Sequence, residues 1–244
     1  RRLEGGARDA PAPDTLDALI ARREAFLAAY QDAALSGRYR ALVDRTRRAE
    51  AALGNGSEAL AEAVARQYAR LLAVKDEYEV ARLYSDGAFM QSLGEQFEHW
   101  DAIRFHMAPP LLARRGTDGR PRKMQFGAWL MPAMRMLASV RRIRGRWFDP
   151  FGHTQERKLE RQLARDYEAL IDELLQALTT DKLATAVALA RVPQTIRGYG
   201  HVKLANVAVA LGRRRELLDQ WKQPAAVSDA ARAAAAPALS PARH

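Results

Sequence analysis

The 244-residue sequence contains no cysteine. This absence excludes disulfide scaffolds, thiol catalysis, cysteine-ligated zinc and iron–sulfur clusters from this chain, because each of them needs thiol or thiolate sulfur. Long apolar runs are missing as well, and no stretch reaches the roughly 20 apolar residues that a membrane-spanning helix needs. We therefore expect no membrane partner, and a cysteine-free chain rich in Ala, Arg and Leu fits the cytoplasm.

Signatures of catalysis are also absent. The chain has no Walker-type nucleotide loop, no GxGxxG after a strand, no HExxH and no nucleophile elbow. The histidines show no metal-ligand spacing to one another; they are His99, His106, His153, His201 and His244. The sequence thus predicts no catalytic residue, no metal site and no cofactor held by this chain.

What the chain does have is an uneven distribution of charge. Its net charge is +10, and the segment from Arg104 to Arg146 contains eleven basic side chains and a single acid, Asp118. The remainder holds 28 basic and 28 acidic side chains and is neutral. A basic segment on a neutral body favours an acidic partner, a phosphate-bearing ligand or nucleic acid.

Helical periodicity dominates the rest of the sequence. The clearest apolar stripe follows a cap at Thr154 and has spacings of three and four residues; it consists of Leu159, Leu163, Tyr167, Leu170, Ile171, Leu174, Leu175 and Leu178. Other helices are expected from Asp14 to about Gly37, over residues 38–53, and from Ser57 with an apolar stripe that continues to Tyr84. A short helix is expected to begin at Asp86. Two more are expected near the C-terminus, one from a cap at Thr180 or Asp181 to Pro193 and a last one that ends near Trp221.

A further helix is expected near Trp129, with Met134, Leu137 and Val140 facing inward and the "RRIRGR" run exposed. Together these patterns predict a mainly α protein with a single helical domain over residues 14–222. Residues 1–13 lack an initiator methionine and an apolar signal core, and we interpret them as a linker within a longer polypeptide. Residues 223–244 are rich in Ala and Pro, which is typical of a disordered tail.

One segment departs from the helical pattern. In "AIRFHM", Ile103, Phe105 and Met107 alternate with Arg104 and His106, which is the two-residue period of a strand. The sequence then predicts a turn at Asp118-Gly119. We therefore expect a small basic β-hairpin over residues 103–127, inserted in the helical domain.

The hairpin is the first candidate binding site. Arg104 and His106 share the polar face of the strand, and the hairpin adds Arg114, Arg115, Arg122 and Lys123. Converging guanidinium and imidazolium groups could form an anion-binding edge or contact an acidic partner. The alternative is a solvated strand face whose polar groups bind water or nearby backbone.

The loop "IRGYGHVK" is the second candidate. Gly198 and Gly200 allow a sharp turn just before a helix N-terminus, where free N–H groups favour an anion, and Arg197, His201 and Lys203 add positive charge. The alternative is an ordinary interhelical loop with Tyr199 in the core.

The acidic run "KDEYEV" could suggest acid–base chemistry. Its charged residues are Lys75, Asp76, Glu77 and Glu79. We interpret them instead as charges that pair along a helix face while Tyr78 and residues 80–84 pack. Nucleic acid is not the partner we expect, because the basic segment and its aromatics form no recognition-helix pattern.

Four segments carry a resemblance to a known family. They are "VKDEYEVARLY" (74–84), "RFHMAPPLLARR" with "DGRPRKMQFGAW" (104–129), "DPFGHTQERKLER" (149–161) and "IRGYGHVKLAN" (196–206). In this order they resemble the C-terminal domain of the fused bacterial indolepyruvate ferredoxin oxidoreductases, in the 2-oxoacid:acceptor oxidoreductase family. The resemblance covers about residues 15–221.

The resemblance implies a parent enzyme that oxidatively decarboxylates aryl 2-oxoacids, uses thiamine diphosphate, iron–sulfur clusters and coenzyme A, and passes electrons to ferredoxin. It also implies a homodimeric parent, with this chain as an appended helical domain that contacts the upstream domains. No catalytic residue is carried over, because the chain has no cysteines and no thiamine diphosphate signature. A stand-alone helical binding module for nucleic acid or an acidic protein remains the alternative.

Overall fold

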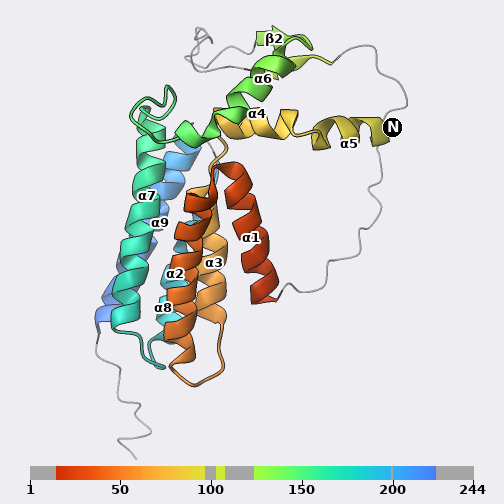
Figure 1. Ribbon diagram of the computed structural model, residues 1–244. Coiled ribbons are helices and arrows are strands. Elements are labelled where there is room, and N and C mark those ends of the chain that lie inside the picture. Colours follow the sequence, from red (N-terminus) through yellow and green to blue (C-terminus); the bar gives the residue numbers. More distant parts are fainter. Residues whose placement is uncertain (1–14, 97–102, 108–123, 199, 224–244) are drawn as a thin grey trace, which may run out of the picture. The chain divides into compact units, whose positions relative to one another are not determined.

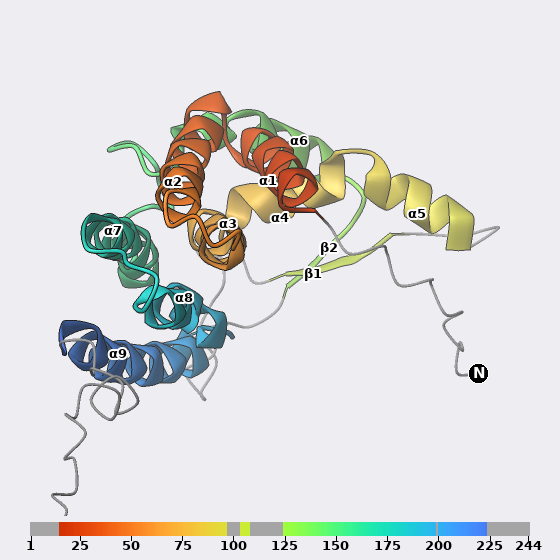
Figure 2. The same cartoon turned by 90° about the horizontal axis from the view of Figure 1, so that it is seen from below.

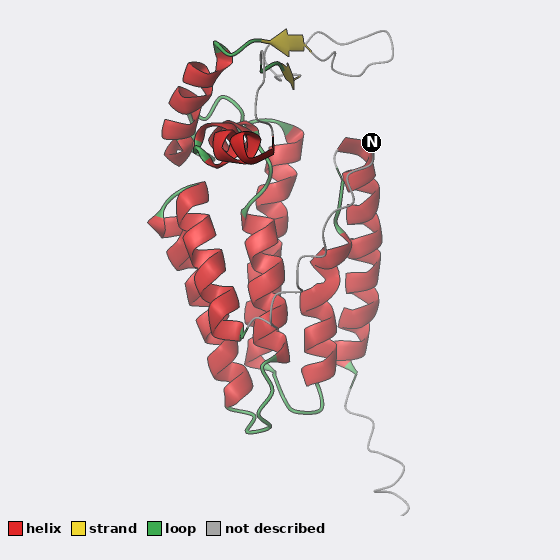
Figure 3. Ribbon diagram, turned by 90° about the vertical axis from the view of Figure 1, so that its right-hand side faces the viewer, coloured by secondary structure: helices red, strands yellow, loops and turns green. Residues whose placement is uncertain are grey.

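A computed structural model describes residues 15–96, 103–107, 124–198 and 200–223 (Figure 1). The described part is mainly helical with one small antiparallel hairpin, as the sequence predicts (Figure 3). Among the helices of these ranges, none combines the length and apolarity that crossing a bilayer requires.

The α-helices, in chain order, are α1 (Leu16–Tyr30), α2 (Ala33–Ala51), α3 (Ala59–Leu72), α4 (Glu77–Ser85), α5 (Ala88–Gln96), α6 (Leu130–Ser139), α7 (Gln155–Gln176), α8 (Leu183–Arg191) and α9 (Gly200–Lys222). Two 3₁₀ turns are η1 (Arg141–Ile143) and η2 (Val192–Thr195). The strands are β1 (Phe105–Met107) and β2 (Met124–Phe126).

The described chain forms two compact units, each built from separate stretches of sequence. Unit 1 contains the described residues up to Leu42 and those from Tyr68 to Glu168; unit 2 contains Val43–Gln67 and the described residues from Ala169 onward. The boundaries fall inside α2, α3 and α7. The single domain over residues 14–222 stays a prediction, and the expected linker and nearly all of the expected tail lie outside the described residues.

In unit 1, α6 packs on α4, and the hairpin contributes to the same small core (Figures 1 and 2). Phe105 pairs with Phe126, His106 with Gln125, and Met107 with Met124. The predicted alternation of β1 is confirmed: Phe105 is buried, whereas Arg104 and His106 are exposed. The turn expected at Asp118-Gly119 lies outside the described residues.

Unit 1 also contains a stack of three buried tyrosines. Tyr68 lies between Tyr39 and Tyr167, with ring centroids 6.1 and 6.0 Å away. The Tyr68 hydroxyl donates to Glu168, which also accepts a forked pair of bonds from Arg38 at 2.6 and 2.9 Å. Burial of the aromatic rings and a satisfied polar end therefore hold α2, α3 and α7 together within this unit.

Unit 2 depends on a buried carboxylate at its helix–turn–helix. Glu50, near the end of α2, is fully buried and accepts bonds from the Ser57 hydroxyl and from the N–H groups of Leu60 and Ala61, at 2.8 to 3.0 Å. It thus supplies acceptors to the free N–H groups that begin α3. Further along, α9 packs against α8 and η2.

Several predicted boundaries were wrong. The first helix ends at Tyr30 instead of Gly37, because Asp32 accepts the Leu35 N–H at 2.9 Å and starts α2 there. The stripe from Ser57 does not continue unbroken to Tyr84, since α3 ends at Leu72 and α4 begins after Asp76.

Two further predictions failed. Neither Thr180 nor Asp181 caps α8, which begins at Leu183 without a side-chain cap bond. Val140, expected to face inward, is exposed, because α6 ends one residue earlier. The cap at Thr154 is confirmed by its bond from the Arg157 N–H at 3.3 Å.

Candidate functional site

The sequence-predicted site residues fall in both units. Arg104 and His106 lie exposed on the hairpin of unit 1. The remaining hairpin residues, Arg114, Arg115, Arg122 and Lys123, lie outside the described residues. The anion-binding edge therefore stays a prediction.

The second predicted site, the glycine loop before α9, belongs to unit 2. Gly198 and Gly200 have φ angles of +90° and +56°, so the expected sharp turn is present. A side chain at Gly198 would also collide with Val202, because a Cβ there would lie 2.8 Å from its Cγ1. Arg197 is exposed and donates to the Gln194 carbonyl at 3.2 Å.

The other two residues predicted for this site are Lys203 and His201. Lys203 is half-buried, and only the backbone of His201, in α9, is described. Tyr199 lies outside the described residues. The loop thus has the expected backbone, and its role as an anion site stays a prediction.

The main polar site of unit 1 centres on Arg144, which sequence reasoning missed. Arg144 was expected to be exposed with the rest of "RRIRGR", yet only 11% of its side chain is accessible. Its Nε and Nη2 donate to the two carboxylate oxygens of Asp76 at 2.5 and 2.9 Å, and its Nη1 donates to the Tyr30 carbonyl at 2.6 Å. The guanidinium carbon lies 3.7 Å from the centroid of the Tyr30 ring, a cation–π geometry.

Asp76 has two roles at once. It is the N-cap of α4, where its Oδ1 accepts the Glu79 N–H at 2.9 Å, and it is the carboxylate partner of Arg144. Its side chain is 4% accessible, so the forked pair is largely removed from water. A buried carboxylate at the start of a helix, fully paired with arginine, fixes α4 relative to the turn that carries Arg144.

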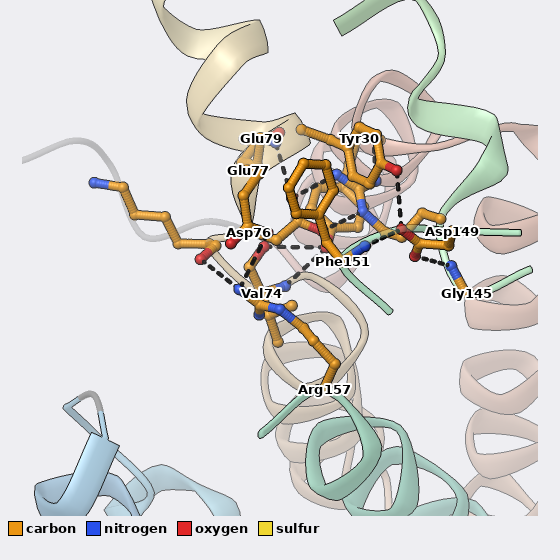
Figure 4. A network of polar contacts seen from close by, with 12 residues as sticks. Tyr30, Val74, Asp76, Glu77, Glu79, Gly145, Asp149, Phe151 and Arg157 are labelled. Atoms are coloured by element: carbon orange, nitrogen blue, oxygen red, sulfur yellow. Dashed lines mark hydrogen bonds and ion pairs between the residues drawn. The ribbon is translucent and has the colours of Figure 1, made fainter. Parts of the chain in front are cut away.

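A second buried carboxylate, Asp149, forms no ion pair with any residue that the structure describes. Its Oδ1 accepts the Tyr78 hydroxyl at 2.9 Å and the Phe151 N–H at 3.0 Å, while its Oδ2 accepts the Gly145 N–H at 2.7 Å (Figure 4). Gly152 is required beside it, since a Cβ there would lie 2.6 Å from Oδ2. The "WFDPFG" turn is therefore closed around its own aspartate.

The start of α7 completes the network. Arg157 donates to Glu160 at 2.7 Å, and its Nη2 lies 3.8 Å from Oε2 of Glu77. That oxygen is buried and accepts no hydrogen bond from any residue that the structure describes. Glu77 is thus the least satisfied carboxylate of the network (Figure 4).

Burial shifts the acidities of this site. It raises the pKa of Tyr30 and of Tyr78 well above the usual phenol range, and Asp76 and Asp149 add to the two increases. Burial also raises the pKa of Glu77, against the lowering effects of its own backbone N–H and of Arg157. The tyrosines are consequently neutral hydrogen-bond donors at physiological pH.

A cavity of about 290 Å³ adjoins the network in unit 1. Its walls include Tyr30, Asp76, Tyr78, Arg144 and Asp149, together with residues of α2, α3 and α7. Within the described ranges, no group of three or more His, Asp or Glu side chains is placed to hold a metal ion. The cavity wall combines arginine side chains with apolar side chains.

The comparison with protein families is reported against this geometry. A family model described as "Family of unknown function (DUF6537)" matches residues 16–216. The chain belongs to the DUF6537 family. The matched range of this DUF6537 chain includes α1 to α8, most of α9 and every residue of the Arg144 network. Searches of curated proteins and of solved structures found no significant match to it.

One of the four segments behind the sequence resemblance, 74–84, contacts two of the others in this DUF6537 chain. Tyr78, from 74–84, donates to Asp149, from 149–161, and its ring meets Phe151 edge-on at 5.4 Å. Tyr84 contacts Phe105, from 104–129, with centroids 5.4 Å apart. The segments that meet in this network could therefore be singled out in the sequence, but their contacts are visible only in the fold.

Proposed function

We propose that this DUF6537 chain is the non-catalytic C-terminal helical domain of an indolepyruvate (2-oxoacid):ferredoxin oxidoreductase. The domain supports assembly of the enzyme and docks an acidic electron acceptor or a phosphate of coenzyme A. Oxidative decarboxylation takes place in upstream domains, which hold the thiamine diphosphate, the iron–sulfur clusters and the coenzyme A. The parent enzyme is a cytoplasmic homodimer.

The observation that carries this proposal is the contact between the three segments in unit 1. The resemblance rests on residues that are far apart in sequence, and chance similarity would have no reason to select segments that bond to each other. The contacts of Tyr78 with Asp149 and of Tyr84 with Phe105 join them. These contacts bring the three segments together in unit 1, and that proximity is what supports the proposal.

The pairing of the buried charges supports a non-catalytic role. The Asp76 carboxylate accepts hydrogen bonds from Arg144 and from the N–H of Glu79 at the start of α4, and Asp149 accepts three hydrogen bonds. A general base needs a carboxylate with a free lone pair toward a substrate. In this network Asp76 and Asp149 have their acceptors occupied, whereas Oε2 of Glu77 accepts no hydrogen bond from a described residue and lies 3.8 Å from Arg157.

The positive charge that is left unpaired supports docking. Arg135, Arg142 and Arg146 are exposed and form no ion pair with any residue that the structure describes. Arg146 directly precedes Trp147, which is 85% exposed, and the sequence from Trp129 to Phe148 contains no acid. Ferredoxins are generally acidic, and such a surface would steer an acidic partner toward itself.

Charge removal in the full-length enzyme tests the docking role. A triple Arg135, Arg142 and Arg146→Gln variant should reduce ferredoxin roughly tenfold more slowly at low salt, with the difference shrinking at high salt because steering is screened. A second set, Arg114, Arg115, Arg122 and Lys123→Gln, extends the test to the expected hairpin.

The matched control removes three arginines from α9, as Arg213, Arg214 and Arg215→Gln, and should leave the rate unchanged. An unaltered rate and salt slope in both test variants would overturn docking. The domain assignment is tested separately by the upstream reading frame. It fails if a start codon lies close to Arg1, and it is supported if cysteine motifs and a thiamine diphosphate signature precede Arg1.

One observation favours the alternative of a stand-alone binding module. An exposed tryptophan that follows an arginine in sequence is also suited to stacking on a nucleic acid base. Fluorescence anisotropy with a single-stranded oligonucleotide separates the two, since binding that is lost in the Arg135, Arg142 and Arg146→Gln variant favours the module.

A further inference from the structure

We propose that the cavity of unit 1 binds a small organic anion, with a carboxylate or phosphate head and a short apolar body. This inference does not rest on the proposed function. The docking surface takes a macromolecule on exposed side chains, whereas the cavity is a separate concave site within unit 1.

The first argument is the charge balance of the cavity wall. Five arginines line it against three carboxylates, Asp76, Asp149 and Glu160. Arg38 is paired with Glu168, Arg144 with Asp76, and Arg157 with Glu160. Arg161 and Arg165 are therefore the lining arginines that form no ion pair with a carboxylate of the described residues, while Asp149 is the lining carboxylate that has no arginine partner.

The second argument is the geometry of these two arginines. Arg157, Arg161 and Arg165 are four residues apart on α7, so they occupy one face of the helix, and all three line the cavity. Arg161 Nη2 donates to the Gly152 carbonyl at 2.7 Å, and Arg165 Nη2 donates to Gln162 Oε1 at 2.6 Å. Each guanidinium has five N–H donors, so most of them remain available to a ligand.

The third argument is the chemistry of the remaining wall. Leu35, Leu71, Leu72 and Phe151 line the cavity and are only half-buried, so they present apolar surface to it. Asp149 also lines the wall, but its carboxylate is bound by three donors that spread its charge. An apolar wall beside these two arginines suits a ligand with one anionic end and one apolar end.

The volume of the cavity limits the size of the ligand. About 290 Å³ lies at the lower end of the range for small-molecule pockets. The cavity is too small for coenzyme A, and a short alkyl or ring body with one anionic group fits it better.

Calorimetric titration of the intact protein tests the proposal. The probes are n-butyl phosphate and butyrate, with inorganic phosphate and n-butanol as halves of the expected ligand. Butyl phosphate, butyrate or both should bind more tightly than either half, and the stronger of the two identifies the head group. Arg161→Gln and Arg165→Gln should each weaken that binding roughly tenfold, the size expected for a lost charge-assisted hydrogen bond.

Arg213→Gln, in α9 of unit 2, is the matched control and should bind as the wild type does. Arg165 is exposed, so its variant keeps the test valid if Arg161→Gln fails to fold. The proposal is overturned if neither amphiphilic anion binds, if butanol binds as tightly as they do, or if Arg165→Gln leaves their affinity unchanged. None of these outcomes bears on ferredoxin reduction.

Discussion

At the scale of single residues, burial separates arginines that look alike in sequence. Arg141, Arg142, Arg144 and Arg146 lie within six residues, yet only Arg144 has a buried carboxylate partner. Its partner Asp76 is 68 residues away in sequence, so no local pattern could distinguish it. Local periodicity placed the run correctly after α6, whereas the identity of the buried cation depends on how distant segments meet.

Replacing Arg144 should therefore cost much more than replacing its neighbour. We expect Arg144→Gln to lower the free energy of unfolding by about 3–5 kcal/mol, because it leaves Asp76 buried without its cation. Arg142→Gln, on the exposed side of the same turn, should change it by less than about 0.5 kcal/mol. Urea denaturation followed by circular dichroism measures both, and equal effects would contradict the assignment of Arg144 as the buried cation.

Glu77 should make stability depend on pH in an identifiable direction. Its pKa is raised in the fold, mainly by burial, with Asp76 and Asp149 adding to the increase and Arg157 opposing it. The folded state then holds the proton more tightly than the unfolded chain, so stability falls as pH rises from the ordinary carboxyl pKa through the raised one. Above the raised pKa, Glu77 is ionised in the fold and its burial lowers the free energy of unfolding by the full amount.

Glu77→Gln removes this titration while Arg157 keeps Glu160 as its partner. The stability of the variant relative to wild type should therefore increase as pH is raised from about 4 to 7 and then level off. Denaturation curves at a series of pH values measure this difference. A difference that is constant over the whole series would show that Glu77 does not carry the effect.

At the scale of elements, helices were predictable and their ends were not. The stripe that follows Thr154 predicted α7 well, because a continuous apolar face is a property of the sequence itself. The break between α1 and α2 was misplaced at Gly37, since glycine is a common helix end but Asp32 forms the cap that starts α2. The predicted end of α3 was misplaced in a similar way, because Asp76 caps a new helix, α4, within the stripe that had been expected to continue.

The turn between α2 and α3 offers a test at this scale. Glu50→Ala should lower the free energy of unfolding by about 2–4 kcal/mol, because it removes the acceptor for Ser57, Leu60 and Ala61 in a buried position. Glu62, which pairs with Arg66 at the surface, provides the control of equal residue type. Glu62→Ala should cost less than about 1 kcal/mol, and similar losses of thermal stability in the two variants would contradict the role of Glu50.

At the scale of the whole molecule, both units are discontinuous in sequence. Residues 43–67 belong to unit 2 but lie between two stretches of unit 1. No single cut in the chain can separate the units, and each must bring together segments that are distant in sequence, which raises the cost of loop closure during folding. Sequence composition shows no boundary here, because the unit borders fall within helices.

The distribution of charge also differs from the sequence-based expectation. The basic segment does contain the excess charge, but Arg144 is neutralised by Asp76, and Arg141 donates to the backbone carbonyls of Ala29 and Ala138. The candidate cavity lay outside every predicted binding site, because Arg157, Arg161 and Arg165 belong to α7, the helix with the most regular pattern. The periodic pattern of apolar residues does not distinguish an arginine that faces solvent from one that lines a cavity.

The exposed indole of Trp147 makes the chain its own fluorescent sensor. Trp147 projects into solvent with Phe148 edge-on beside it and the Trp147 carbonyl 2.9 Å from His153 Nε2, whereas Trp221 is buried in unit 2. A water-exposed indole emits at longer wavelength than a buried one, so the two emissions are spectrally distinct. Trp129 is exposed as well, at 67%, so replacing Trp100 and Trp129 with Phe leaves Trp147 as the exposed reporter. In that variant, any molecule that settles on this loop changes the long-wavelength component, and no label is needed to detect it.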